Sequence, residues 1–343
     1  MSYRYIGNKT KLLDTLLLYI RKYSTEGSTI VDLMCGTASV SEMLKLNNYQ
    51  VVSSDMMTYS TQHASVRLLA NEEPTFSKLS LGSYSNVLTY LENIEPIEGV
   101  FFREYSPAGE PLNGTSPRQY FTPENAKQID SITNQINIWK SENKLSRLEE
   151  SFLRHDLVLA ANKVANIAGT YGHFRSKWNN SSLKKLKLQK TEIIPHENVN
   201  HTVIQGQAES IAKNITADLC YIDPPYMKRQ YAANYHILET IARGDEPEAV
   251  GMSGLRPWRD QYSNFCSKRK IRDSFTKIIM EMNCNKFLIS YSEDGLLSKD
   301  ELISLFSNFG SVECFEIDYQ RFKSNQSKLS KNMKEYLFYI KKK

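Results

Sequence analysis

The chain has 343 residues, of which 41% are hydrophobic and 24% are charged, and its formal net charge is +5. These values are ordinary for a globular protein of one large domain or two, and so mild a charge does not by itself indicate a nucleic-acid partner. No apolar run approaches the roughly 18 residues that span a bilayer, and no secretory leader opens the chain, so we expect a cytoplasmic protein. The five cysteines form no CxxC pair, which argues against a zinc site or a disulfide framework.

The first 60 residues have the pattern of a nucleotide-binding half. Residues 9–23 carry leucines at helical spacing and predict an amphipathic helix. A strand over 28–33 leads into a turn of small residues and a helix, and a second strand over 51–55 ends at Asp55. Asp55 follows the turn by about 20 residues, the spacing at which an acid binds a ribose in Rossmann-like folds. Taken alone, the turn is equally consistent with a plain strand–helix connection, and Asp55 with a helix cap.

Residues 61–199 show no dominant strand alternation and favour a mostly helical insertion, which we assign to target recognition. Thr122 followed by Pro123 indicates a helix start, with a capping side chain and proline at the first helical position. A further helix is expected over 150–168, ended by Gly169.

After the insertion, the pattern of a parallel sheet resumes. Strands are expected over 218–223, 286–291 and 312–319, with a helix over 298–307 and a last strand over 335–341 that could pair with 312–319 as a hairpin. We therefore predict an α/β, Rossmann-like fold with a mixed, mostly parallel sheet and a C-terminal antiparallel hairpin. Its domain is built from residues 1–60 and 200–343.

Three clusters of basic residues lie in segments predicted to be loops. Residues 171–190 and 321–334 carry no acid, and the third cluster, 268–272, follows Arg256 and Arg259. Each cluster alone is more simply a solvated face. Three together favour a rim that contacts phosphates.

The segment with the most chemical information is Asp223-Pro224-Pro225-Tyr226, at the end of the strand over 218–223. Proline has a fixed φ and no N–H, so the turn is rigid and offers carbonyl acceptors. A carboxylate, a carbonyl and an aromatic face together suit an exocyclic amino group on a planar ring, such as adenine N6. A simple turn is the alternative explanation, since Asp and Pro are common turn formers.

These motifs, taken in order, resemble the alpha-class (Dam-like) DNA adenine N6-methyltransferases. The shared features are Tyr-x-Gly-x-Lys at Tyr5–Lys9, Asp-x-x-x-Gly at Asp32–Gly36, the acid Asp55 and Asp-Pro-Pro-Tyr. The run Arg229-Gln230-Tyr231-x-x-Asn-Tyr-His is similar to that of the restriction-modification subgroup. The resemblance spans nearly the whole chain.

The resemblance implies S-adenosyl-L-methionine as cofactor and assigns residues to it. Tyr5, Lys9, Asp55 and Asp223 would contact the cofactor, while Asp32 and Gly36 would line its methionine end. Met34 and Ala38 depart from the usual aromatic residue and second glycine of the turn, which leaves cofactor affinity in doubt. Either Gln207 or Glu209 could contact the cofactor's adenine.

The resemblance also implies a mechanism and a DNA partner. Asp223 and the Pro224 carbonyl would accept hydrogen bonds from adenine N6 during direct methyl transfer, with no enzyme nucleophile and no metal. The adenine must leave the duplex, and Tyr226 would stack on it. Candidate DNA contacts are Tyr171, Arg175, Lys177, Arg229, Arg256, Arg321 and Lys323. A cognate restriction endonuclease acting on the same site is a further partner that the subgroup suggests, although a solitary enzyme fits equally.

Two other functions compete with this one. The chain could methylate another amino group, in RNA or in a protein amide, although Asp rather than Asn or Ser before Pro-Pro-Tyr favours adenine. It could also be a non-catalytic DNA-binding protein that kept the fold, against which the intact Asp223–Tyr226 motif and Lys9 argue. Binding of S-adenosylmethionine separates the methyltransferases from the non-catalytic alternative.

Overall fold

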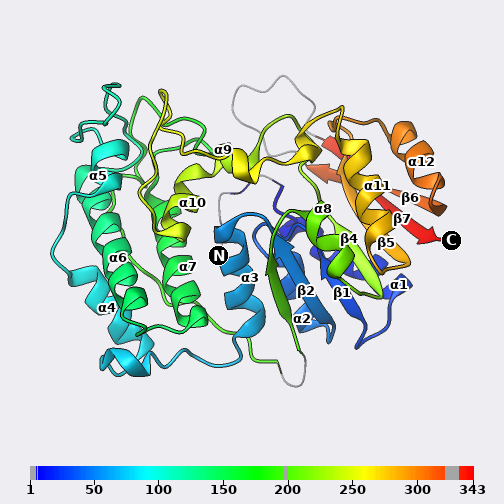
Figure 1. The fold of residues 1–343 in the computed structure, drawn as a ribbon, viewed down its shortest axis with the longest axis horizontal. Helices are drawn as coiled ribbons and strands as arrows, with labels where there is room; N and C mark the ends of the chain where they lie inside the picture. Colours follow the sequence, from blue (N-terminus) through cyan, green and yellow to red (C-terminus); the bar gives the residue numbers. More distant parts are fainter. Residues whose placement is uncertain (1–4, 6, 197–199, 321–331) are drawn as a thin grey trace. The chain divides into compact units, whose positions relative to one another are not determined.

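The computed structural model describes residues 5, 7–196, 200–320 and 332–343. The chain forms two compact units (Figure 1). A helical unit comprises Met1–Asn8, Met57–Glu197 and Tyr231–Tyr262, and an α/β unit comprises Lys9–Met56, Asn198–Gln230 and Ser263–Lys343. The helical unit therefore takes in residues 231–262, which the sequence analysis assigned to the α/β part. In the described part of the chain, every helix is too short or too polar to cross a bilayer.

The α/β unit contains a sheet whose order, in the described residues, is β3-β2-β1-β4-β5-β7-β6. The strands are β1 (Thr29–Asp32), β2 (Gln50–Asp55), β3 (Thr202–Gln205), β4 (Leu219–Ile222), β5 (Lys286–Ser292), β6 (Gly310–Gln320) and β7 (Asn332–Lys342). Pairing is parallel from β3 through β5, and β7 runs antiparallel to both β5 and β6. The predicted mixed, mostly parallel sheet is confirmed. The hairpin is also confirmed, with β7 inserted between β5 and β6.

The core of this unit lies where apolar strands meet amphipathic helices. All four residues of β4 are buried, as expected for a central parallel strand. The helices are α1 (Leu13–Tyr23), α2 (Ser39–Leu46), α8 (Ala208–Ile211), α11 (Ile271–Glu281) and α12 (Lys299–Ser307), and the short 3-10 turn η1 (Thr10–Leu12) precedes α1. Residues of α8, α11 and α12 form one apolar cluster with β1, β4, β5 and β7. This packing fixes the ends of the central strands, where the predicted site residues lie.

The helical unit contains α3 (Thr58–Leu69), α4 (Tyr84–Asn93), α5 (Val100–Tyr105), α6 (Pro123–Ser141), α7 (Arg147–Val164), α9 (Tyr231–Asn234) and α10 (His236–Arg243). The Thr122 side chain accepts a hydrogen bond from Asn125 N, so the predicted cap and proline start of α6 are confirmed. The expected helix over 150–168 ends earlier, at Val164. Ala165 is extended, and Asn166 N donates instead to the Tyr120 carbonyl.

Segment 231–262 joins this unit through specific contacts of α10. Its residues Ile237, Leu238 and Ile241 are fully buried, and α10 packs against α3 and α7. The Glu239 carboxylate accepts from the backbone N–H groups of Thr58 and Tyr59, the first residues of α3. An anionic side chain at a helix N-terminus satisfies backbone donors that have no partner within the helix.

Candidate active site

Asp223 follows β4 directly, so its carboxyl group lies at the carboxyl end of a central strand. β4 pairs with β1 on one side and β5 on the other. In open parallel sheets, ligands bind outside the carboxyl ends of the strands. Asp32 and Asp55 are the last residues of β1 and β2, and Asp223 is the first residue after β4. These three strands are neighbours in the sheet, so the three acids lie at the same edge.

Asp223 shares a buried cation with a second carboxylate. Lys9 Nζ lies 2.9 Å from Asp223 Oδ1 and 2.8 Å from Glu335 Oε1. The side chains of Lys9 and Glu335 are 6% and 3% exposed, whereas that of Asp223 is 16% exposed. Lys9, the first residue of the α/β unit, therefore pairs with Asp223 after β4 and with Glu335 on β7. Of the two carboxylates, that of Asp223 is the more exposed.

Burial and charge act in opposition on these groups. The pKa of Asp223 is raised overall to about 6. Burial and the Glu335 carboxylate raise it, and the Lys9 ammonium lowers it. Burial lowers the pKa of Lys9, but the two carboxylates outweigh this effect and hold it well above its ordinary value. The cluster is thus one ammonium between two carboxylates, with Asp223 ionised at neutral pH and close enough to its pKa to take up a proton.

Tyr226 stands beside this cluster. Its ring centroid lies 5.8 Å from Lys9 Nζ and 6.0 Å from the centroid of Tyr291, which it meets edge-on. Tyr226 is half-buried and Pro224 is buried, so the turn is anchored while part of the tyrosine remains accessible. An ionised carboxylate beside a partly exposed aromatic side chain can accept hydrogen bonds from an amino group and hold a planar ring.

The turn between β1 and α2 is built from left-handed backbone and buried hydrogen bonds. Gly36 and Ala38 have φ of 52° and 58°. Gly36 N donates to Asp55 Oδ2 at 3.0 Å, and Ser41 Oγ donates to Asp32 Oδ2 at 2.6 Å. Burial raises the pKa of Asp32 to about 7, against the opposing effect of the Ser41 hydrogen bond. The N-terminus of α2 has no side-chain cap, so its backbone N–H groups can receive a ligand.

Each of the other predicted cofactor residues has surroundings described within its own unit. Tyr5 belongs to the helical unit, where its ring stacks on Tyr235 with centroids 4.6 Å apart. Glu209 is buried and accepts hydrogen bonds from Asn264 and, at 2.7 Å, from Ser274 Oγ. Gln207 is half-buried and lies just beyond the end of β3.

The predicted DNA contacts differ in their exposure. Arg175, Lys177 and Arg229 are exposed. Tyr171 is fully buried, with its carbonyl accepting from Tyr120, and Arg256 is 3% exposed and paired with Asp245. Direct DNA contact is therefore not expected from the last two. Arg321 and Lys323 lie outside the described residues.

Sequence analysis did not identify Glu335. Over residues 333–337 of β7 the buried positions alternate, and Glu335 falls in step with Met333 and Leu337, which are both buried. An acid in step with apolar residues on the inward face of a strand was the only available indication.

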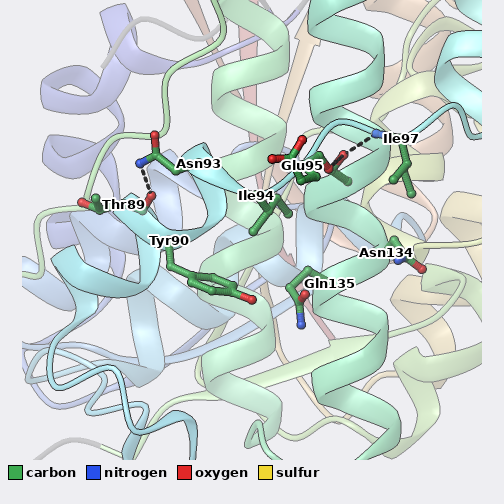
Figure 2. A pocket seen from close by; sticks show the side chains of 9 residues that line it. Thr89, Tyr90, Asn93, Ile94, Glu95, Ile97, Asn134 and Gln135 are labelled. Atoms are coloured by element: carbon green, nitrogen blue, oxygen red, sulfur yellow. Dashed lines mark hydrogen bonds between the residues drawn. The ribbon is translucent and has the colours of Figure 1, made fainter.

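The helical unit also has an open groove of about 550 Å³ beside α4 and α6 (Figure 2). Its lining combines the ring of Tyr90 with two isoleucines, one acid and uncharged polar side chains: Ile94, Ile97, Glu95, Thr89, Asn93, Ser131, Asn134 and Gln135. Ser131 Oγ accepts from Ile97 N at 2.9 Å and fixes one wall. None of the predicted site residues that the structure describes lines this groove. In the described residues, no group of three or more His, Cys, Asp or Glu side chains is arranged to hold a metal ion.

Comparison with known proteins identifies the family. A family model described as D12 class N6 adenine-specific DNA methyltransferase matches residues 5–305. The chain is 37% identical to the type II methyltransferase M.FokI of Planomicrobium okeanokoites and 34% identical to the modification methylase StsI of Streptococcus sanguinis. It is 33% identical to the type II methyltransferase M.NlaIII of Neisseria lactamica.

These matches cover 99%, 99% and 98% of this chain, respectively. They cover 52% of M.FokI, 52% of StsI and 99% of M.NlaIII, so the chain spans about half the length of the first two relatives and nearly all of the third. The chain belongs to the D12 class of N6 adenine-specific DNA methyltransferases.

Proposed function

We propose that this chain is a site-specific DNA methyltransferase that transfers a methyl group to N6 of a flipped adenine in double-stranded DNA. The observation that carries the proposal is the Asp223 carboxylate at the end of β4, held 2.9 Å from a buried lysine in a chain of this family. The relatives M.FokI and M.NlaIII are named type II methyltransferases. By analogy, we propose a role in a restriction-modification system, with a cognate endonuclease as partner.

The proposed cofactor, S-adenosyl-L-methionine, fits the residues at the strand ends. Asp55 offers a carboxylate for ribose hydroxyls, and the small residues Gly36 and Ala38 allow close approach to left-handed backbone. The uncapped N-terminus of α2 suits the methionine carboxylate, because backbone N–H groups and the helix dipole favour an anion there. Gln207, beyond β3, is a better candidate for the adenine of the cofactor than Glu209, which is engaged by Asn264 and Ser274.

When bound, the cofactor supplies an electrophilic methyl group on a sulfonium. The protein's task is to make adenine N6 nucleophilic and to hold it in place. The Asp223 carboxylate and the Pro224 carbonyl would accept hydrogen bonds from the two N6 hydrogens. These hydrogen bonds draw electron density onto the nitrogen and stabilise its developing positive charge. The amino nitrogen must then lose one proton. Asp223, with a pKa of about 6, can hold that proton at Oδ.

Tyr226 would stack on the extruded adenine. Stacking of a base on an aromatic side chain is worth roughly 1–3 kcal/mol. Extrusion from a duplex requires a few kcal/mol, so Tyr226 would offset much of it. Its half-buried ring beside Asp223 and Tyr291 supports this role.

The DNA contacts proposed here are exposed basic residues. Arg175 and Lys177 lie in the helical unit and Arg229 in the α/β unit, and each is exposed as a phosphate contact requires. We propose the helical unit, centred on the predicted insertion 61–199, for target recognition. Arg321 and Lys323 stay predictions.

The test is to express the chain and an Asp223→Ala variant in cells that lack adenine methylation and to sequence the DNA by a single-molecule method. N6-methyladenine at one short motif, with the intact chain alone, is the expected result. DNA without modified adenines from cells that make folded protein would refute the proposal and favour RNA or protein amides as substrates. Modified DNA from the Asp223→Ala cells would refute the role of Asp223.

A further inference from the structure

We propose that Glu335 is a positioning residue of the reaction, which holds the Lys9 ammonium against Asp223 and places a second negative charge beside it. The inference rests on the proposed function. It assigns a role to a strand, β7, that lies beyond the residues matched by the family model.

The fold brings Glu335 to the site because β7 is antiparallel. β4 and β5 are parallel, so their carboxyl ends lie at the same edge of the sheet. β7 runs in the opposite direction, so its first residues lie at that edge. Glu335 lies near the start of β7, opposite Ser292 at the end of β5 and Ile317 of β6. The register therefore delivers this carboxylate to the edge where Asp223 follows β4.

Glu335 is held by the same ammonium as Asp223. Lys9 Nζ donates to Glu335 Oε1 at 2.8 Å, in a contact buried on both sides. A lysine has three donors and a flexible stem of four carbons. A second acceptor fixes the head of that stem, so that Lys9 remains at 2.9 Å from Asp223 Oδ1.

The charge of Glu335 matters as much as its position. A lone Lys9–Asp223 pair would be neutral, and the cation would make Asp223 a weaker base and a weaker hydrogen-bond acceptor. The second carboxylate offsets that effect. Other titratable groups also face this network: Asp32 at the end of β1, Tyr221 on β4 and Tyr226 after it. Of these, burial holds the pKa of Tyr221 well above its ordinary value, and Asp32 is partly protonated at physiological pH, with a pKa of about 7.

The experiment compares Glu335→Gln with the wild-type chain in single-turnover methylation of unmethylated genomic DNA across about pH 5–9. Glutamine keeps an oxygen that can accept from Lys9 but removes the charge. Because Glu335 raises the pKa of Asp223, the acid limb of the rate profile should move to lower pH. The maximal rate should fall by about three- to tenfold, because Asp223 becomes a weaker base.

Two further variants separate charge from structure. Glu335→Asp keeps the charge on a shorter side chain, so its acid limb should stay with that of the wild type. Glu313→Gln removes a half-exposed carboxylate on β6 of the same hairpin and should change neither the limb nor the rate. Equal displacement of the limb in Glu335→Gln and Glu335→Asp, or none in either, would overturn the proposal.

A titration without DNA or cofactor separates this inference from the proposed function. Carbon-13 signals of aspartate carboxyls, with Asp223→Asn to identify the Asp223 signal, should show a midpoint near 6 in the wild type and a lower midpoint in Glu335→Gln. If the midpoint moves in Glu335→Gln but the wild-type chain methylates no DNA, the effect of Glu335 on Asp223 stands and the proposed methylation of DNA is refuted. An unchanged midpoint in a folded Glu335→Gln chain refutes the inference, whatever the activity.

Discussion

Replacing Lys9 with methionine tests the buried cluster most directly, because it removes the cation and keeps a side chain of similar length. Lys9 and Glu335 are 6% and 3% exposed, and Lys9 contacts two carboxylates at 2.9 and 2.8 Å. Removal of one partner from a buried ion pair typically destabilises a protein by about 3–5 kcal/mol. We expect a loss of that size near pH 8, where both carboxylates would be left without their cation.

The loss should depend on pH with a definite sign. The pKa of Asp223 is raised to about 6 even with Lys9 present, and it rises further without the cation. A carboxyl group whose pKa is higher in the folded than in the unfolded state stabilises the fold when protonated, and that contribution is lost as pH rises through the folded-state pKa. Lys9→Met should therefore be closest to the wild type near about pH 5 and furthest from it near about pH 8.

Thermal unfolding measured at both pH values provides the assay, and in a chain of 343 residues a loss of this size corresponds to a fall of roughly 4–7 °C in melting temperature. Lys22→Met is the matched control, because Lys22 pairs with Glu313 at the surface, where both side chains are 49% exposed. It should leave the melting curve nearly unchanged. A Lys9→Met chain as stable as the wild type near pH 8, or equally destabilised at both pH values, would refute the reasoning.

Three further predictions concern the base, the first turn and the DNA. Tyr226→Ala should slow methylation of duplex DNA roughly tenfold more than methylation of an adenine in a mismatch, because stacking offsets extrusion; equal losses on both substrates count against it. Burial raises the pKa of Asp32 to about 7, so an ionised Asp32 destabilises the fold above that pH. Asp32→Asn should therefore gain about 2 kcal/mol relative to the wild type between about pH 5 and 8 in chemical denaturation, and a constant difference would contradict this. Arg175→Ala with Lys177→Ala should weaken binding to all DNA sequences and lower the salt dependence of log K by about 2; an unchanged slope would remove both residues from the interface.

Short-range sequence patterns were enough to predict the centre of the fold. β4 and the Asp-Pro-Pro-Tyr segment are contiguous, and a buried apolar strand followed by two prolines has one simple arrangement. The Thr122 cap of α6 was equally local. In both cases the residues that decide the structure are neighbours in the sequence.

Features that depend on distant partners were not predicted. Glu335 gains its role from Lys9, 326 positions away. The edge strand β3 has no fully buried residue, so it lacks the apolar run that indicated β4. Segment 231–262 joins the helical unit because Glu239 of α10 caps α3 and α10 packs on α7. Neither contact can be predicted from the sequence around α10 alone. Val164 ends α7 for a similar reason, since Asn166 is bound by Tyr120.

The insertion of β7 between β5 and β6 has a consequence for synthesis of the chain. Ribosomes make β6 before β7, yet β6 pairs only with β7 in the described sheet. Until β7 emerges, the nascent chain exposes an unpaired strand and the open edge of β5, which are templates for aggregation. β6 carries three exposed acids, Glu313, Glu316 and Asp318. Charges so placed oppose the stacking of one unfinished chain on another, so the same hairpin that completes the sheet also protects its assembly.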